Sequence, residues 1–278
     1  MRFVFITAFL ALNLFAQMRV VALSPAANEI IYALGMGKSV VGNTTYCNYP
    51  KEAQKVQKVG GYFNPSLERI VALSPDLVVM QQNNYKIAKQ LQKLSIKTQI
   101  ISIDTLKNIK QSILQLGILF GKEQKAKEIV SKIENSLTSL KNILQNKKIL
   151  IVFGHNLKLT SHVFVAGNNL YLDDIIKYSG NKNAFYSKRK AQPVLGLENI
   201  IATNPDIVIL LTHSLKKSSL TPNDLLKPWQ NLPINASKTN SIYILDKAQD
   251  GIPSQRIVYF IKDFKEILQD YAKRCTSL

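Results

Sequence analysis

The sequence lacks the motifs that mark most enzymes. It contains no G-x-S-x-G, no H-E-x-x-H, no phosphate-binding P-loop and no G-x-G-x-x-G fingerprint. It also has only three histidines and two cysteines among 278 residues. An enzyme on a two-lobed α/β scaffold is therefore a distant alternative, since no nucleophile, base or metal constellation supports it.

Cysteine is scarce, and the two cysteines lie far apart in the sequence. Cys47 and Cys275 do not have the spacing of a metal site. An exported protein could join them in a disulfide bond, but such a bond requires tight geometry that the sequence does not reveal. A disulfide and two unrelated free thiols both stay open.

Long hydrophobic runs are also missing, apart from a short one at the start. Met1 and Arg2 are followed by the uncharged segment 3–16. This run is shorter than the ~20 residues of a membrane span and is typical of a signal peptide. A buried first strand or helix is the alternative, but a second strand-like start follows at 18–23. No cysteine lies near the expected cleavage point, so we expect a periplasmic protein without a lipid anchor.

Acidic residues are half as frequent as basic ones, 18 against 36, and the net charge is +18. This excess raises the possibility of nucleic-acid binding. The lysines, however, are scattered through segments with a helical pattern, and no arginine-rich run occurs. The charge therefore indicates a solvated basic surface, and no nucleic-acid partner is predicted.

Short apolar runs with strand character alternate with helical patterns along the chain. This alternation is typical of α/β layers around a parallel sheet. A long helical pattern without proline or glycine lies mid-chain, and the alternation restarts after it. We predict a signal peptide over 1–16, an N-terminal α/β lobe over 17–121, a long linking helix over 122–147 and a C-terminal α/β lobe over 148–278.

An internal repeat supports the two-lobed organisation. Residues 67–80 read LERIVALSPDLVVM and residues 197–210 read LENIIATNPDIVIL, with seven of fourteen positions identical at a constant offset of 130. The pattern predicts a short helix, a Pro-Asp turn and a buried strand. Two similar lobes would enclose a cleft, which is a preferred place for small ligands.

The repeat also preserves a glutamate that packing does not require, Glu68 in one copy and Glu198 in the other. Each lies in the first turn of a predicted helix, where the helix dipole stabilises an acid by about 0.3–1 kcal/mol. Alternatively, the two carboxylates protrude from matched positions and dock onto paired arginines of a partner.

Five motifs carry a resemblance to a known family: SPAANE (24–29), ALGMGKSVVG (33–42), YCNYP (46–50), VGGYFNPSLE (59–68) and ALSPDLV (72–78). In these the chain resembles the iron-siderophore/cobalamin periplasmic binding proteins of ABC importers. The resemblance implies two Rossmann-like lobes bridged by one long helix, no catalysis and no intrinsic cofactor. It also implies a monomer that delivers a metal chelate to an inner-membrane permease. In this family a glutamate on each lobe contacts the permease, and Glu68 and Glu198 fall on those positions.

The resemblance places the ligand between the lobes, on loops that follow the strands. Candidate ligand-binding residues there are Tyr46, Tyr62, Phe63, Gln192, Asp250 and Arg256. The aromatic rings could stack on a flat corrin, porphyrin or catecholate, or they could be core residues. Asp250 and Arg256 could bind ligand amides or carboxylates, or be a helix-start acid and a surface arginine.

The identity of the chelate stays open at this point. Cobalamin, a ferric siderophore, haem and a nickel chelate all fit aromatic loops with few polar groups. His155 and His213 follow predicted strands and are weak candidates for direct metal coordination, with ordinary loop histidines as the alternative. Tyr46 or Tyr62 could instead ligate haem iron.

Overall fold

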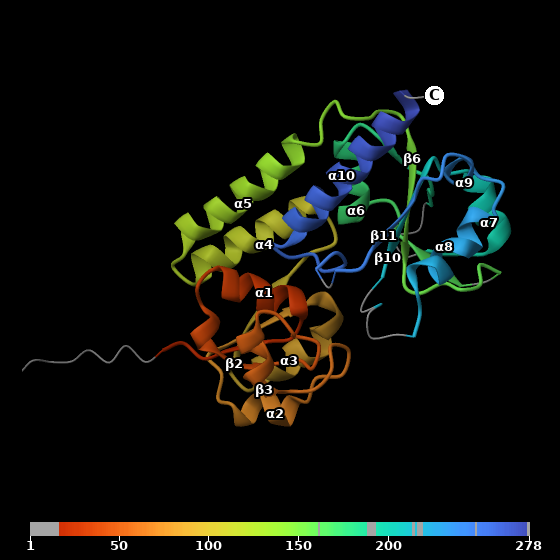
Figure 1. Cartoon of the computed structure of the whole chain (residues 1–278). Coiled ribbons are helices and arrows are strands. Elements are labelled where there is room, and N and C mark those ends of the chain that lie inside the picture. The colour runs from red at the N-terminus through yellow and green to blue at the C-terminus, as the bar shows by residue number, and fades with distance from the viewer. Residues whose placement is uncertain are drawn as a thin grey trace, which may run out of the picture.

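The computed structural model describes residues 17–160, 162–187, 193–212, 215, 219–247 and 249–276. It contains two α/β lobes, each with its own sheet, which confirms the predicted fold class (Figure 1). The predicted signal peptide, 1–16, lies outside the described residues. Within the described ranges, no helix is long and apolar enough to cross a membrane.

The first lobe is built on a parallel five-stranded sheet with the order β3-β2-β1-β4-β5. Its central strands are continuous apolar runs because helices cover both faces of the sheet. Ser24 caps the start of the first helix, because its hydroxyl oxygen accepts a hydrogen bond from the backbone amide of Ala27 at 3.1 Å. The elements are β1 (Val20–Ala22), α1 (Pro25–Ala33), β2 (Val40–Asn43), β3 (Gln57–Lys58), α2 (Leu67–Ala72), β4 (Leu77–Gln81), α3 (Tyr85–Lys93), β5 (Lys97–Ile101) and α4 (Leu106–Leu119).

The second lobe has a six-stranded mixed sheet with the order β11-β10-β6-β7-β9, and β8 pairs with β6. Strand β7 runs antiparallel to β6 and β9. The elements are β6 (Lys148–Phe153), β7 (Val163–Val165), α6 (Tyr171–Tyr178), β8 (Lys182–Asn183), β9 (Val194–Leu195), α7 (Leu197–Thr203), β10 (Ile207–Leu211), α8 (Pro222–Gln230), α9 (Asn235–Lys238), β11 (Ile242–Leu245) and α10 (Ile257–Thr276).

The two copies of the repeat occupy equivalent places in separate sheets. One copy forms α2 and β4 beside β1, and the other forms α7 and β10 beside β6. Asp76 accepts the amide of Arg19 at 2.7 Å, and Asp206 accepts the amide of Lys148 at 2.8 Å. Each aspartate thus satisfies a backbone donor at the start of the neighbouring strand, which explains why both copies keep Pro-Asp before the apolar run.

The linking helix is shorter than the predicted 122–147. Helix α5 spans Glu123–Thr138, and turns and coil lead on to β6. Leu140 continues the apolar spacing and is fully buried, but it lies in a turn after the helix end. Asn142 and Asn146 have φ values of 63° and 59°, a left-handed conformation that does not continue an α-helix. The periodic spacing of apolar residues therefore predicts a longer helix than the structure contains.

One apolar core extends through both lobes. It contains Val20 and Ile31 from the first lobe, Ile133 from α5, and Ile151 and Phe264 from the second lobe, all fully buried or nearly so. Helix α5 packs against both α4 and α10, and these three helices lie along one side of the molecule (Figure 1). The lobes therefore share a packed helical layer in addition to the chain connection.

The two cysteines are not bonded to each other. Cys47 is buried in the first lobe, with its Sγ 3.2 Å from the hydroxyl of Thr44, and burial raises the pKa of its thiol. Cys275 is exposed near the end of α10. The structure therefore contains two free thiols.

A candidate ligand cleft between the lobes

A cleft with a volume of 670 Å³ lies between the two lobes, within the size range of small-molecule sites. Loops at the carboxyl ends of β1, β4, β5 and β6 contribute to it, as expected for parallel sheets. The lining residues are Pro25, Ala26, Tyr46, Tyr62, Phe63, Gln81 and Ile103 from the first lobe and Phe153, Leu170, Tyr171, Gly251, Ile252 and Pro253 from the second.

A sharp glycine turn presents two of the predicted aromatic residues to the cleft. Gly60 has a φ of 118°, and a Cβ at this position would lie 2.9 Å from the carbonyl oxygen of Asn64. Tyr62 and Phe63 follow and pack edge to face, with ring centroids 4.6 Å apart. The Tyr62 hydroxyl donates to Oε1 of Gln81 at 2.9 Å, and burial raises the pKa of this phenol. The hydrogen bond fixes the orientation of the Tyr62 ring, and the raised pKa keeps its phenol neutral.

Two further tyrosines face the cleft from opposite lobes. Tyr46 is 62% exposed, and its hydroxyl forms no hydrogen bond with another described residue. Tyr171 starts α6, and its amide donates to the carbonyl of Asp104 in the first lobe at 2.6 Å. Burial and the charge of Asp250 raise the pKa of Tyr171. No acidic residue, lysine, arginine or histidine belongs to the described lining of the cleft.

The structure places Asp250 behind the wall of the cleft rather than in its lining. Its side chain is almost fully buried, one oxygen accepts the amide of Lys247 at 3.2 Å, and the other has no partner among the described residues. Burial and the nearby charge of Asp263 raise its pKa to about 6, although Lys247 and Arg256 act in the opposite direction. Its role as a ligand contact stays a prediction.

Arg256, the other half of this predicted pair, is also not part of the described lining. Its guanidinium is buried and binds the carboxylate of Glu29 on α1, with Nε 3.0 Å from Oε2. The sequence predicts a ligand contact or a surface arginine at this position, and the buried partner Glu29 is not predicted. Glu29 belongs to the SPAANE motif, which carries the family resemblance but gives this residue no chemical role.

The remaining candidates are not brought together in the described part of the chain. Gln192 and His213 lie outside the described residues. His155 follows β6 but is not part of the cleft lining, and its Nε2 is buried without a described partner. Among the described residues, no group of three or more histidine, cysteine or acidic side chains could hold a metal ion.

Four lining residues were not identified from the sequence: Ile103, Phe153, Leu170 and Tyr171. Phe153 is the last residue of β6, and Ile103 follows the end of β5. The end of a strand is the sequence signal that could have found these two residues.

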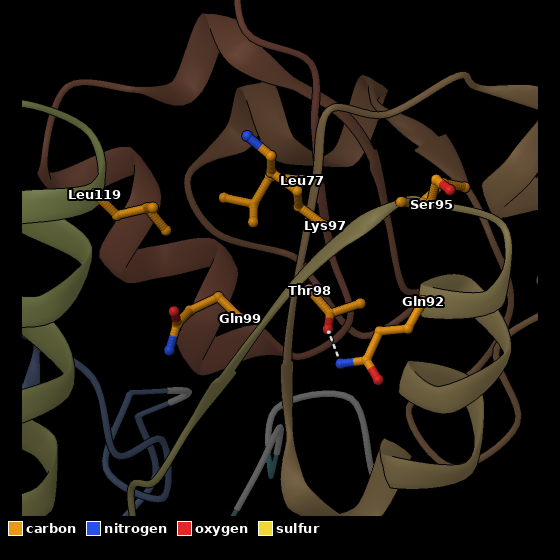
Figure 2. Close-up of a pocket in the computed structure, with 8 residues that line it drawn as sticks. Leu77, Gln92, Ser95, Lys97, Thr98, Gln99 and Leu119 are labelled. Atoms are coloured by element: carbon orange, nitrogen blue, oxygen red, sulfur yellow. Dashed lines mark hydrogen bonds between the residues drawn. The ribbon is translucent and has the colours of Figure 1, made fainter.

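A second hollow, of 440 Å³, lies along the edge strand β5 at the opposite end of the first sheet. Figure 2 shows its side chains spread over β5 and the neighbouring elements, with Gln92 on α3 and Leu119 on α4. The one hydrogen bond drawn there joins Gln92 to Thr98 at 3.1 Å. This surface offers no convergent polar groups, so the interlobe cleft is the better ligand site.

The repeated glutamates lie on the surface in matched environments. Glu68 and Glu198 are each the second residue of a short helix, exposed, with a fully buried isoleucine two residues later. Neither carboxylate forms an ion pair with another described residue. Both are therefore available to a partner, and their docking role stays a prediction.

Two lobes, a shared helical layer and an uncharged interlobe cleft define the class of two-lobed solute-binding proteins. The periplasmic binding protein family model matches residues 20–248, and the chain belongs to this family.

Known proteins with similar sequence or structure agree with this assignment. The chain is 31% identical over 202 residues to a vitamin B12-binding protein of Salmonella paratyphi A, covering 71% of this chain and 73% of that protein. Among solved structures, the periplasmic vitamin B12-binding protein of Vibrio cholerae superposes with a TM-score of 0.76 at 19% identity, covering 92% of this chain and 98% of the other. The periplasmic haem-binding protein of the same organism gives 0.76 at 21% identity, with 91% and 99% covered.

Proposed function

We propose that this chain is the substrate-binding component of an ABC importer and captures one metal chelate between its lobes. The observation that carries the proposal is the interlobe cleft, with aromatic rings from both lobes and no charged side chain in its described lining. Flat macrocycles bind well between such rings, and a chelator brings its own metal ligands.

A corrinoid is the chelate that this cleft favours. Corrinoids carry neutral amides at their periphery, and these suit the uncharged hydroxyl and amide groups of Tyr46, Tyr62, Tyr171 and Gln81. A ligand with free carboxylates would bury charge in this lining without a paired cation, which is costly. The name of the Salmonella relative supports the same choice.

Haem is the second candidate, and one observation favours it. Tyr46 projects an exposed hydroxyl into the cleft that no described residue engages, and a tyrosine oxygen can ligate haem iron. Tyr62 is the poorer iron ligand, because burial raises the pKa of its phenol and its hydroxyl donates a hydrogen bond to Gln81. Ferric siderophores and nickel chelates are less favoured members of the same class.

Delivery to the permease uses Glu68 and Glu198. Each carboxylate occupies the same place in its lobe, exposed and without an ion-pair partner among the described residues. One acidic contact per lobe fixes the orientation of the protein on a membrane partner. Residues 1–16 direct export, and the protein works as a monomer outside the cytoplasm.

Native mass spectrometry of the protein isolated from its own cells tests this proposal. We expect one chelate per chain, with the mass and absorbance of a corrinoid or, failing that, of haem. A bound sugar, amino acid or peptide in place of a chelate would contradict the proposal. Binding of DNA that weakens as salt is raised would instead support the nucleic-acid alternative.

A further inference from the structure

A buried ion pair joins the two lobes beside the cleft. Glu29 lies on α1 of the first lobe and Arg256 precedes α10 of the second, with 2% and 9% of their side chains exposed. Nε of Arg256 donates to Oε2 of Glu29 at 3.0 Å, and Nη2 donates to Oε1. The Ser254 hydroxyl donates to the same Oε2 at 2.5 Å. Two parallel hydrogen bonds of this kind fix orientation as well as distance.

Each side of the ion pair lies close in sequence to residues that line the cleft. Helix α1 begins with Pro25 and Ala26, which line the cleft, and Glu29 lies one turn further along. On the other side, Ser254 follows Pro253 directly, at the end of the lining loop 251–253. Movement of one wall away from the other would therefore separate Glu29 from Arg256 and Ser254.

The first lobe also holds the guanidinium from a second side. The ring of Tyr49 lies over it, with the ring centroid 3.9 Å from the central carbon. The carbonyl of Tyr49 accepts from Nδ2 of Asn28 at 2.8 Å, and Asn28 in turn accepts from Asn43 at 3.1 Å. A side chain of the second lobe is thus seated in a site built by the first lobe.

We propose that Glu29 and Arg256 are positioning residues that set the width of the ligand cleft. Separation of a buried ion pair leaves charges without partners, so the lobes remain at the spacing at which the pair is closed. A cleft that is already formed loses less freedom on binding, and ligand therefore leaves more slowly. This inference rests on the proposed capture of a ligand between the lobes.

The distance between spin labels on the two lobes tests the width without any ligand. Labels are placed by Lys93→Cys on α3 and Asn199→Cys on α7, both exposed positions, with Cys275→Ser to remove the exposed thiol. Glu29→Gln removes the charge and keeps the side-chain shape. The matched control is Glu134→Gln, which removes a carboxylate from the exposed pair with Lys110, 2.9 Å long, away from the cleft.

We expect a broader distance distribution with a longer mean in Glu29→Gln, and an unchanged distribution in Glu134→Gln. Arg256→Lys keeps the charge but loses the planar fork, so it should give an intermediate result. An unchanged distribution in folded Glu29→Gln, or equal broadening in the control, would overturn the proposal. If Glu29→Gln does not fold, Arg256→Lys takes its place. A broader distance distribution in folded Arg256→Lys would then support the proposal, and an unchanged one would overturn it.

Ligand release provides a second readout, with cyanocobalamin and haemin as probes. We expect Glu29→Gln to release the bound probe at least tenfold faster, with an association rate within about threefold of the parent. An equal release rate would overturn the proposal. If the parent protein binds neither probe, the proposed corrinoid or haem ligand is wrong, whereas the spin-label distances still decide the role of the ion pair.

Discussion

At the scale of single residues, the cleft depends on aromatic side chains that the fold leaves accessible. Phe63 is 82% exposed, and its ring contacts the ring of Tyr62. Such a side chain contributes little to folding, because it stays in water. Exposure of this ring costs the free protein little stability, and a bound ligand can bury the ring.

Phe63→Ala should therefore weaken ligand binding without destabilising the protein. Loss of a ring buried by the ligand is expected to cost about 1–2 kcal/mol, or roughly a 5- to 30-fold rise in Kd, while the melting temperature stays the same. Titration with the bound chelate and thermal unfolding check both parts. Phe164→Ala, which removes an exposed ring on β7 outside the cleft lining, is the control. Equal losses in both variants would count against the site.

Asp250 gives a prediction of pH dependence. Its pKa in the folded protein is raised from 3.8 to about 6, so the folded state holds a proton that the unfolded state has released between these values. The contribution of this group to stability is full below about pH 4 and is lost as the pH rises through 6, by at most about 3 kcal/mol.

Asp250→Asn should consequently stabilise the protein at pH 8 and have little effect at pH 4. Urea unfolding at the two pH values measures the difference. Asp224→Asn is a control of opposite sign, because hydrogen bonds from Thr221 lower the pKa of the Asp224 carboxyl. That variant should lose stability at pH 8. Destabilisation by Asp250→Asn at pH 8 would show that the carboxylate makes a favourable contact there.

At the scale of helices and strands, the repeated unit determines how much the sequence alone could predict. The Pro-Asp turns and apolar runs predicted α2, β4, α7 and β10 to within one or two residues. Helix α8 was not predicted, and Pro228 lies inside it, where a proline normally argues against a helix. The end of α5 was misjudged because buried apolar residues continue through a turn.

The candidate site was less predictable than the elements for a physical reason. The family resemblance, helped by the glycine turn before Tyr62 and Phe63, predicted these two residues and Tyr46, and all three line the cleft. The contact between Glu29 and Arg256 spans 227 positions of the chain, and only the packing of the two lobes brings it about. Local patterns in one sequence carry no information on such a pair.

The two short helices of the repeat lead to a prediction about transport. Glu68→Lys and Glu198→Lys should each leave chelate binding unchanged and reduce uptake by at least tenfold, because each reverses one docking charge. Uptake into proteoliposomes that contain the cognate permease measures the effect. Glu52→Lys reverses another exposed carboxylate of the first lobe and should leave uptake intact. Normal uptake with both repeat glutamates reversed would contradict docking through them.

At the scale of the whole molecule, the shared core makes the two lobes one cooperative unit. Apolar residues of both lobes and of α5 form one continuous cluster. The carboxylate of Asp174 in the second lobe also accepts the amide of Leu106, at the start of α4, at 2.8 Å. The lobes therefore lose favourable contacts if either one unfolds alone.

We expect a single unfolding transition in urea. Trp229, the one tryptophan of the chain, is fully buried in the second lobe, so its fluorescence reports on that lobe alone. Circular dichroism at 222 nm, a wavelength that detects helices in general, reports on both lobes. The two curves should coincide. A fluorescence midpoint clearly below the circular dichroism midpoint would indicate that the lobes unfold separately.

The central claim is that the cleft between the lobes binds one macrocyclic chelate, a corrinoid or haem. An absorbance titration of residues 17–278 with cyanocobalamin and haemin, repeated on Phe63→Ala, tests it most directly. The account predicts saturation at one molecule per chain for at least one of the two probes, with weaker binding in the variant. Saturation with the same affinity in the variant, or no binding of either probe to the parent protein, would contradict it.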